Sequence, residues 1–230
     1  MTVTLITGAN KGLGFEAAQR LKKLGHTVYI GSRDEERGKE AAEKLEAQYI
    51  VLDVTNEESV KNAAIEIEKR EGYIDVLINN AGISGNHSFV QDITADMMEQ
   101  VYNTNVFGIV RVTQHFLPLL KKSNQPVIVN VSSGLGSFGQ VTNPEKIEST
   151  VNALAYCSSK AAVSMLTLQY AKGLPDIRIN AVDPGPTKTD LTGHGFQTLE
   201  QGTDAIVKMA TIDNSGPTGI FINRDGIIPW

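Results

Sequence analysis

The chain lacks the features that would place a protein outside the cell or in a membrane. It has one cysteine, Cys157, so no intrachain disulfide can form, and a reducing compartment fits this composition best. No apolar stretch approaches the ~20 residues that a bilayer-spanning helix needs. The opening residues, MTVTLITGAN, contain no basic region, long apolar run or cleavage site, so we expect no signal peptide. These absences predict a cytoplasmic protein without membrane contact.

Basic charge and metal-binding patterns are also scarce. The net charge is −5, from 21 Lys and Arg residues against 26 Asp and Glu residues. Nucleic-acid-binding proteins usually carry a basic patch, so we expect no nucleic-acid partner. The four histidines show no spacing such as H-x-x-x-H, and we expect no metal site. They are His26, His87, His115 and His194.

What the sequence does show is an alternation of short β-rich runs with helical patterns, which is typical of βαβ units around a parallel sheet. Strands are expected at 3–8, 26–33, 49–54, 75–82, 126–133, 177–185 and 219–223. Helices are expected at 11–25, 34–48, 56–72, 95–122, 155–173 and 198–210. Seven strands in 230 residues leave little room for a second unit, and no linker or repeat interrupts them. We therefore predict a single α/β domain over residues 1–230.

Two segments do not fit regular structure. Residues 134–154 and 186–197 form long connections that each follow the end of a predicted strand. Open α/β sheets bind ligands at the carboxyl ends of their strands, and long loops there are often functional. We predict that both segments are active-site loops.

A glycine-rich segment, TGANKGLG, joins the first predicted strand to the first predicted helix. Gly8, Gly12 and Gly14 would let the backbone turn sharply and approach a pyrophosphate, which the free N–H groups of the helix N-terminus would bind. The spacing is G-x-x-x-G-x-G rather than the common G-x-G-x-x-G. The alternative is a glycine-rich turn without a ligand, but its place between strand and helix favours a dinucleotide site.

The end of the second predicted strand bears on the choice of dinucleotide. An acidic residue there favours NAD, whereas an arginine accommodates the 2′-phosphate of NADP. This chain has Ser32 and Arg33 at that point, and Lys11 in the glycine loop could reach the same phosphate. We predict NADP(H), although Asp34 keeps a carboxylate nearby and both cations could be solvated surface charges.

The segment YCSSK places Tyr156 four residues before Lys160, so both side chains share one face of a helix. A phenol has a pKa of about 10 and is a poor acid or base at neutral pH. A nearby positive charge would lower that pKa. Taken alone, the pair would be a packed aromatic residue followed by a solvent-facing lysine.

Seven motifs that follow one another along the chain favour a functional interpretation of the Tyr156–Lys160 pair. They are TGANKGLG, Asp53–Val54, NNAG at 79–82, NTNVFG at 103–108, NVSS at 130–133, YCSSK at 156–160 and DPGPTKT at 183–189. Over nearly its whole length the chain resembles the short-chain dehydrogenase/reductase family. The loop ANKGLG, the Ser32–Arg33 pair and the terminal DGIIPW resemble its carbonyl-reductase-like branch. The resemblance implies a Rossmann fold with a doubly wound, seven-stranded parallel sheet of order 3-2-1-4-5-6-7 and helices on both faces.

The resemblance also implies a role for each motif residue. Tyr156 would be the general acid in carbonyl reduction, with its pKa lowered by Lys160 and by the oxidised nicotinamide. Ser133 would hold the substrate oxygen, and Asn105 would position a relay water next to Lys160. The implied cofactor-binding residues are Gly8, Asn10, Lys11, Gly12, Leu13, Gly14, Arg33, Asp53, Val54, Asn80, Ala81, Gly82, Tyr156, Lys160, Pro184, Gly185, Thr187 and Thr189.

One departure concerns the serine. Ser133 and Tyr156 are 23 positions apart, more than is usual in the family, and Ser132 is the alternative because it faces the other side of the strand. Candidates for the pocket wall are Ser84, Gly85, Phe138, Gln140, His194 and Phe196.

The leading interpretation is NADPH-dependent reduction of a small-molecule aldehyde or ketone. One alternative is an NAD(P)-dependent alcohol dehydrogenase that works in the oxidative direction. The other is a non-catalytic NADP(H) sensor or scaffold. The resemblance favours a homo-oligomer that pairs through its long helices, unless the segment 134–154 obstructs that contact.

Overall fold

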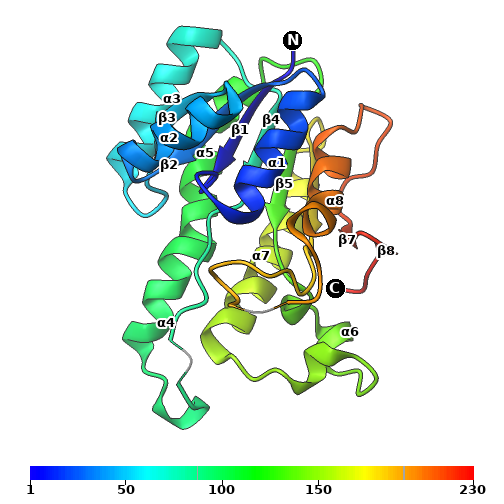
Figure 1. Ribbon diagram of the computed structural model, residues 1–230. Helices are drawn as coiled ribbons and strands as arrows, with labels where there is room; N and C mark the ends of the chain where they lie inside the picture. The colour runs from blue at the N-terminus through cyan, green and yellow to red at the C-terminus, as the bar shows by residue number, and fades with distance from the viewer. Residues whose placement is uncertain (87, 194) are drawn as a thin grey trace.

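Eight strands form one sheet in the order β3-β2-β1-β4-β5-β6-β7-β8 (Figure 1). The computed structural model describes residues 1–86, 88–193 and 195–230, so His87 and His194 lie outside the described residues. The strands are β1 (Val3–Thr7), β2 (Thr27–Ser32), β3 (Gln48–Val51), β4 (Val76–Asn79), β5 (Val127–Val131), β6 (Arg178–Val182), β7 (Phe221–Asn223) and β8 (Gly226–Ile227). The predicted order of seven parallel strands is confirmed. The structure adds β8, which turns back to pair antiparallel with β7.

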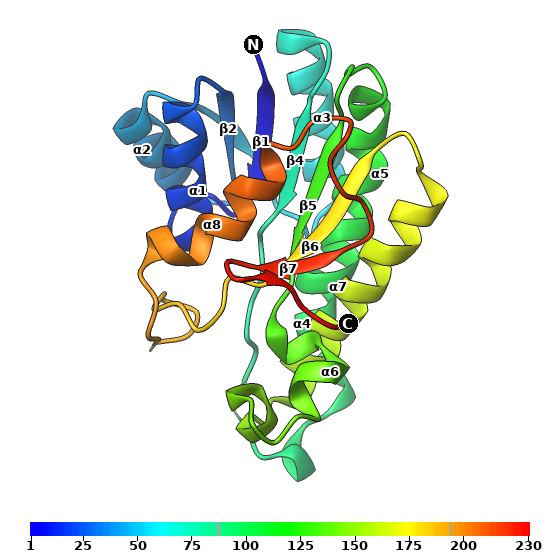
Figure 2. The same ribbon diagram turned by 90° about the vertical axis from the view of Figure 1, so that its right-hand side faces the viewer.

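Helices cover both faces of the sheet, as predicted for a doubly wound fold (Figure 2). The α-helices are α1 (Gly12–Lys23), α2 (Glu35–Leu45), α3 (Glu57–Glu71), α4 (Ala95–Tyr102), α5 (Gly108–Leu120), α6 (Phe138–Val141), α7 (Leu154–Gly173) and α8 (Leu199–Ala210). Helices α1, α2 and α8 pack on one face, whereas α3, α5 and α7 pack on the other. No helix among the described residues is long and apolar enough to cross a membrane.

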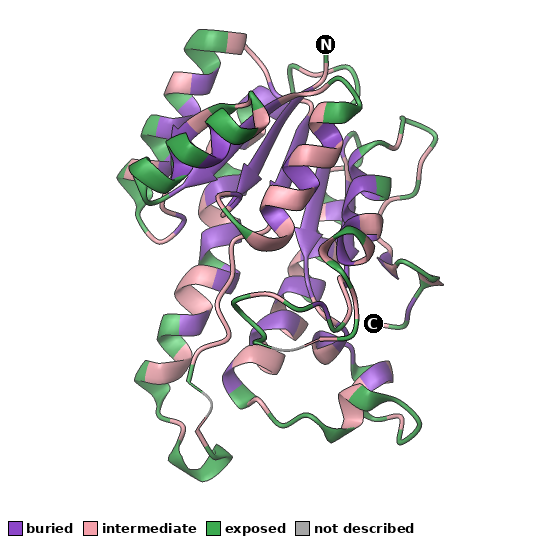
Figure 3. Ribbon diagram, viewed as in Figure 1, coloured by how far each residue is buried: buried purple, intermediate pink, exposed green. Residues whose placement is uncertain are grey.

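The central strands are buried along their whole length (Figure 3). On β1, Leu5 faces one helical layer and Ile6 the other, and neither is exposed to solvent. Burial on both faces is why these strands are almost continuously apolar instead of alternating. The rigid sheet fixes the positions at which its strands end, and therefore the residues that follow them.

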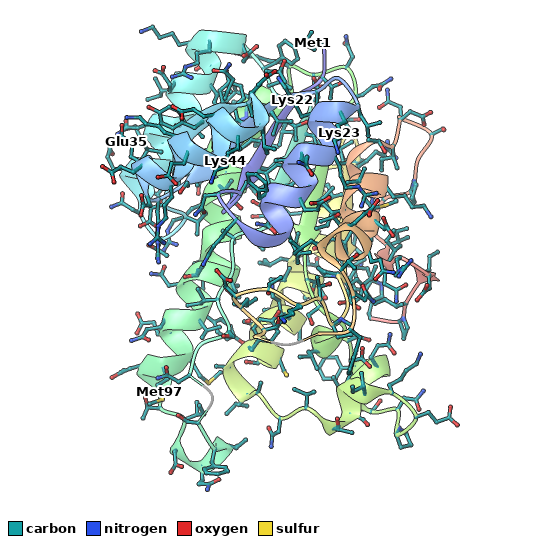
Figure 4. The ribbon with its side chains drawn as sticks, in the orientation of Figure 1. Met1, Lys22, Lys23, Glu35, Lys44 and Met97 are labelled. Atoms are coloured by element: carbon teal, nitrogen blue, oxygen red, sulfur yellow. The ribbon has the colours of Figure 1, made fainter. Side chains whose placement is uncertain are left out.

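The backbone dipole of helix α1 runs between the two edges of the sheet, with its negative end at the amino-terminal edge. Helix α1 ends with Lys22 and Lys23, which lie near Met1 at the amino-terminal edge of the sheet (Figure 4). Cations are favourable at a helix C-terminus because the backbone dipole is negative there. Gly25 follows with φ +86°, a left-handed conformation that suits glycine. The N-terminus of α1, which carries partial positive charge, therefore points to the opposite edge.

The helix predicted over 95–122 is interrupted. A π-helix, Asn103–Phe107, separates α4 from α5. A π turn takes in one extra residue and is often found at functional sites. The sequence pattern did not show this interruption.

The predicted loop 134–154 also contains regular structure. It folds into the 3-10 turn Gly134–Gly136, the short helix α6 and the 3-10 turn Ile147–Thr150. The end of the chain holds the first half of this segment. The Ser137 hydroxyl donates to the Pro229 carbonyl, and Trp230 stacks on Phe221 with ring centroids 5.5 Å apart.

Candidate active site

The motif residues gather at the carboxyl edge of the sheet, where β1, β4, β5 and β6 end beside the N-terminal half of α7. Neighbouring parallel strands end at matching levels, since Asn79 pairs with Asn130 and Val131 pairs with Val182. The residues that follow these strands therefore meet at the same edge. The segment 186–197 passes across the same region (Figure 1).

Ser133 lies beside Tyr156, close enough for its hydroxyl to lower the pKa of the phenol. The same hydroxyl accepts the backbone N–H of Leu135 at 3.2 Å. Ser132 faces the other way and is buried, with its Oγ 3.0 Å from both the Lys160 carbonyl oxygen and the Ser164 hydroxyl. The structure thus brings Ser133, and not Ser132, to the tyrosine.

Lys160 is buried one helical turn after Tyr156. Its Nζ donates to the Val131 carbonyl oxygen at 2.8 Å and lies 5.6 Å from the centroid of the Tyr156 ring. Burial lowers the pKa of Lys160 to about 8, and the nearby Asp183 partly opposes that shift. The ammonium is therefore held where a modest change of pH removes its charge.

Tyr156 differs from the sequence-based expectation. Burial raises the pKa of Tyr156 to about 12, the nearby Ser133 hydroxyl lowers it, and the charge of Asp183 raises it further. The expected lowering by Lys160 is absent in this structure because Nζ lies over the ring and bonds to Val131. The phenol therefore keeps its proton at neutral pH.

Asn105 sits in the π turn with its amide fully engaged. Its Nδ2 donates to the Ile83 carbonyl and the Ser159 hydroxyl, and its Oδ1 accepts the Ile83 N–H at 2.9 Å. The side chain thus fixes the segment after NNAG, and both of its N–H donors are used. A Cβ built on Gly82 would lie 3.4 Å from Asn105 Oδ1 and 3.6 Å from Lys160 Nζ. Glycine at position 82 therefore keeps side-chain atoms out of the space between the two residues.

The glycine loop has the shape that a dinucleotide site requires. Gly8 and Gly12 adopt φ +63° and +59°, and a Cβ on Gly14 would meet the Asn80 amide nitrogen at 2.6 Å. The Asn80 amide donates to the Thr7 and Gly8 carbonyls, so it braces the loop, and its predicted contact with the cofactor stays a prediction. Ala81 packs against the same turn, because a Cβ on Gly8 would meet its Cα at 3.0 Å.

The start of α1 fits an anion. Side chains cap the N-termini of α2, α3, α4, α6 and α8, whereas none caps α1 at Lys11, the residue before its first turn, nor α5 or α7. A Cβ on Gly12 would meet nothing within 4 Å, so this turn faces open space. Free N–H groups at a helix N-terminus bind phosphate well. Asn10 and Leu13 are half-buried in the same loop.

The residues at the end of β2 favour a phosphate over a ribose hydroxyl. Asp34 is engaged, since it accepts the Arg37 N–H at 3.1 Å as the cap of α2 and lies 3.4 Å from the Arg37 guanidinium. Arg33 is exposed and forms no ion pair within the described part of the chain. Lys11 is paired with Asp190, 2.7 Å away, rather than directed at the predicted phosphate position beside Arg33.

The remaining predicted cofactor residues make hydrogen bonds or packing contacts within the protein. Asp53 Oδ1 accepts from Thr55, while Val54 is buried against Gly108. Gly185 has φ +67°, which the Pro184–Gly185 turn requires. The buried Thr187 donates to the Pro184 carbonyl at 3.0 Å, and Thr189 pairs with Thr192.

The comparison with known families agrees with this geometry. The family model described as short chain dehydrogenase matches residues 2–200. The chain belongs to this family. It is therefore an oxidoreductase built on a Rossmann-like fold, as the sequence motifs implied.

Several relatives of this short-chain dehydrogenase resemble it over almost their whole length. The short-chain dehydrogenase/reductase 1 of Saponaria officinalis is 33% identical over 287 aligned positions, which cover 98% of this chain and 95% of the relative. The (+)-neomenthol dehydrogenase of Arabidopsis thaliana is 32% identical, with 96% and 95% covered. The NADPH-bound carbonyl reductase from chicken fatty liver has a TM-score of 0.87 and 29% identity, with both chains covered completely.

The alignment with the Saponaria relative is longer than the 230 residues of this chain, so the relative has segments that this short-chain dehydrogenase lacks. Candidate pocket residues on the two active-site loops lie close to solvent, since Phe138 is 71% exposed and Phe196 is 81% exposed. Gln140 is buried, and Ser84 and Gly85 are half-buried. His194 lies outside the described residues.

Sequence analysis missed three residues that shape this site. Asp183 is buried beside Lys160, Ser159 bonds to Asn105, and the Thr7 hydroxyl accepts the N–H groups of Asn80 and Ala81. All three lie inside motifs that the sequence shows, TGANKGLG for Thr7, YCSSK for Ser159 and DPGPTKT for Asp183, but no pattern assigns them these contacts. A hollow at the opposite edge, lined by Met1, His26 and Asp75 among others, includes none of the site residues.

Proposed function

We propose that this short-chain dehydrogenase reduces an aldehyde or ketone to an alcohol with NADPH, and that Tyr156 is the general acid. The observation that carries the proposal is a protonated, half-buried phenol that lies next to the Ser133 hydroxyl and one helical turn before a buried lysine. A general acid must hold its proton at the working pH and lie within hydrogen-bond reach of the acceptor. A phenol whose pKa is about 12 is protonated at neutral pH, as the proton donor in carbonyl reduction must be.

The cofactor is NADP(H), which supplies the hydride when bound. The uncapped start of α1 and the turn at Gly12 support a pyrophosphate site. The free guanidinium of Arg33 supports recognition of the 2′-phosphate, because arginine binds phosphate through a planar fork of donors. In this proposal Asp53 contacts the adenine, and the Pro184–Gly185 turn with Thr187 faces the nicotinamide.

Each catalytic side chain has a separate task in the proposal. The Ser133 hydroxyl orients the substrate carbonyl oxygen next to the phenol, and Tyr156 gives that oxygen its proton. The Lys160 ammonium stabilises the phenolate that remains, as a nearby positive charge does for any anion. Asn105 fixes the backbone beside Lys160, where a proton from solvent can return to the phenol.

The substrate in this proposal is a small or varied carbonyl compound and not one large, enclosed molecule. Two observations support this choice. The chain lacks segments that its longer relatives carry, and Phe138 and Phe196 on the two active-site loops are largely exposed. Apolar side chains at the rim favour substrates with an apolar body next to the carbonyl group.

Consumption of NADPH and of NADH with a panel of small aldehydes, ketones, diketones and quinones tests the proposal, with wild type and Tyr156→Phe assayed side by side. We expect turnover with NADPH that falls at least ~100-fold in the variant, the usual effect of losing a general acid, while NADPH affinity persists. Tyr102→Phe, a tyrosine on α4, is the matched control and should retain activity. Turnover that survives Tyr156→Phe would show that another group donates the proton.

A further inference from the structure

Asp183 is a buried acid that joins two turns of the candidate site. It follows β6 directly and is 5% exposed. Its Oδ1 accepts the backbone N–H of Gly185 at 2.9 Å, and the carboxylate lies against the backbone of Gly134, whose N–H lowers the pKa of Asp183. Gly134 immediately follows Ser133, and Gly185 belongs to the Pro-Gly turn. One carboxylate thus ties the turn that carries the serine to the turn predicted to face the nicotinamide.

The close approach of Gly134 supports this link. A Cβ at position 134 would lie 3.2 Å from Asp183 Oδ2 and 3.0 Å from Glu148 Oε1. The strands contribute as well, since the Ser132 N–H donates to the Val182 carbonyl at 2.8 Å. The carboxylate therefore lies at a junction that the sheet has already brought together, where it is bonded to the Gly185 turn and packed against the Gly134 turn beyond the last strand pair.

The charged and titratable groups around this carboxylate are few. Lys160 and Tyr156 face it from α7, and Glu148 faces it from the turn Ile147–Thr150. Burial raises the pKa of Asp183, whereas the two backbone N–H groups and the charge of Lys160 lower it. No atom of Asp183 lies within ion-pair distance of Lys160 among the described residues, so Asp183 acts on α7 through its field.

We propose that Asp183 is a positioning residue of the reaction, whose carboxylate holds the Ser133 turn against the Pro-Gly turn and keeps a negative charge beside the Tyr156–Lys160 pair. This inference rests on the proposed function for the kinetic part of its test. Asp183 does not touch the reacting atoms. It sets where Ser133 stands and how readily Tyr156 and Lys160 release their protons.

Asp183→Asn separates the effect of the charge from the effect of the hydrogen bonding, because asparagine keeps the size and one oxygen acceptor but removes the charge. We expect the basic limb of the pH profile for carbonyl reduction to move to lower pH by about one unit, the size of effect that a neighbouring charge produces. Asp183→Ala also removes the hydrogen bonds, and we expect kcat to fall by about tenfold or more with a smaller change in the Kd for NADPH. Glu148→Gln is the matched control and should shift the profile less, since Glu148 is only half-buried and makes no hydrogen bond to either turn.

A second readout needs no turnover. The ultraviolet absorbance of the Tyr156 phenolate, isolated by subtracting the titration of Tyr156→Phe, reports the ionisation of Tyr156 in the free protein. We expect Tyr156 to ionise at lower pH in Asp183→Asn than in wild type. If wild type reduces no carbonyl, the proposed function fails, whereas this titration still tests Asp183. An unchanged Tyr156 titration in Asp183→Asn, or equal shifts for Asp183→Asn and Glu148→Gln, would overturn the inference.

Discussion

The Lys160 ammonium lies 5.6 Å from the centroid of the Tyr156 ring and faces the ring rather than the phenol oxygen. Its hydrogen bond goes to the Val131 carbonyl, at the end of the strand that leads to Ser133. The two residues are close enough for the charge of one to influence the other, but each retains its own environment. Their pKa values therefore move in opposite directions from the usual values of lysine and tyrosine.

The pH dependence of reduction follows from these two shifts. With a pKa of about 8, Lys160 is charged at lower pH and neutral at higher pH, whereas Tyr156 stays protonated up to about 12. We expect kcat/KM for carbonyl reduction to be constant below about pH 7 and to fall as the pH rises through about 8, because the charge of Lys160 is lost there. Initial rates measured across the pH range check this. A rate that stays flat to about pH 10 would assign no role to the Lys160 charge.

Ser133→Ala and Ser132→Ala form a matched pair of neighbouring substitutions. Removing the Ser133 hydroxyl takes away a positioned hydrogen-bonding group, and we expect kcat to fall about 10²–10³-fold with little change in stability. Removing the Ser132 hydroxyl breaks buried hydrogen bonds, so we expect the free energy of unfolding to fall by about 1–3 kcal/mol with a small effect on kcat. Steady-state kinetics and thermal unfolding of both variants distinguish the two roles. The reverse pattern would make Ser132 the functional serine.

Arg33→Ala should change the cofactor preference without changing the chemistry. A charge-assisted hydrogen bond contributes about 1.5–3 kcal/mol. We therefore expect KM for NADPH to rise about 10–100-fold, while KM for NADH stays nearly constant. Arg37→Ala is the control, because Arg37 forms a surface ion pair with Asp34 and surface pairs contribute about 0–1 kcal/mol. Equal effects of the two substitutions on NADPH would argue against a phosphate contact at Arg33.

Gly82→Ala tests the space between Asn105 and Lys160. The added methyl would lie at ordinary contact distance from both side chains, so we expect the fold to persist and kcat to fall by about tenfold. Gly136→Ala is a contrasting substitution, because its methyl would lie 2.4 Å from the Lys160 carbonyl carbon. Overpacking of that kind costs about 1–3 kcal/mol of stability. Calorimetry and kinetics would separate the two, and full activity in Gly82→Ala would mean that this space serves no purpose in the reaction.

Most of the fold could be predicted from the sequence because buried parallel strands give recognisable runs of mainly apolar residues. Runs such as Val3–Thr7 and Val127–Val131 are largely apolar and buried over their whole length, and the helices between them show their own period. Helix ends were predictable where a side chain caps them, as at Asn56. The strand β8 and the π turn were missed. A two-residue strand carries almost no pattern, and the register of a helix depends on what it packs against.

For the site, the residue types were predictable but several contacts were not. Motif order indicated Tyr156, Lys160 and Ser133, and the structure brings them together. Burial raises the pKa of Tyr156 in this structure, whereas the predicted lowering also involves the charge of a bound nicotinamide and stays a prediction. Lys11 and Asp190 are 179 positions apart, and no sequence pattern shows that two exposed residues at that separation will pair.

The π turn at Asn103–Phe107 makes the position of Asn105 independent of the helices α4 and α5 on either side. A regular α-helix through the same segment would need one residue fewer, while α4 and α5 on either side would keep their directions and their packing. The position of Asn105 therefore depends on a single inserted residue and not on the helix as a whole. Loss or gain of one codon could remove or restore the Asn105–Ile83 bonds in a descendant of this gene while the Rossmann scaffold remained intact.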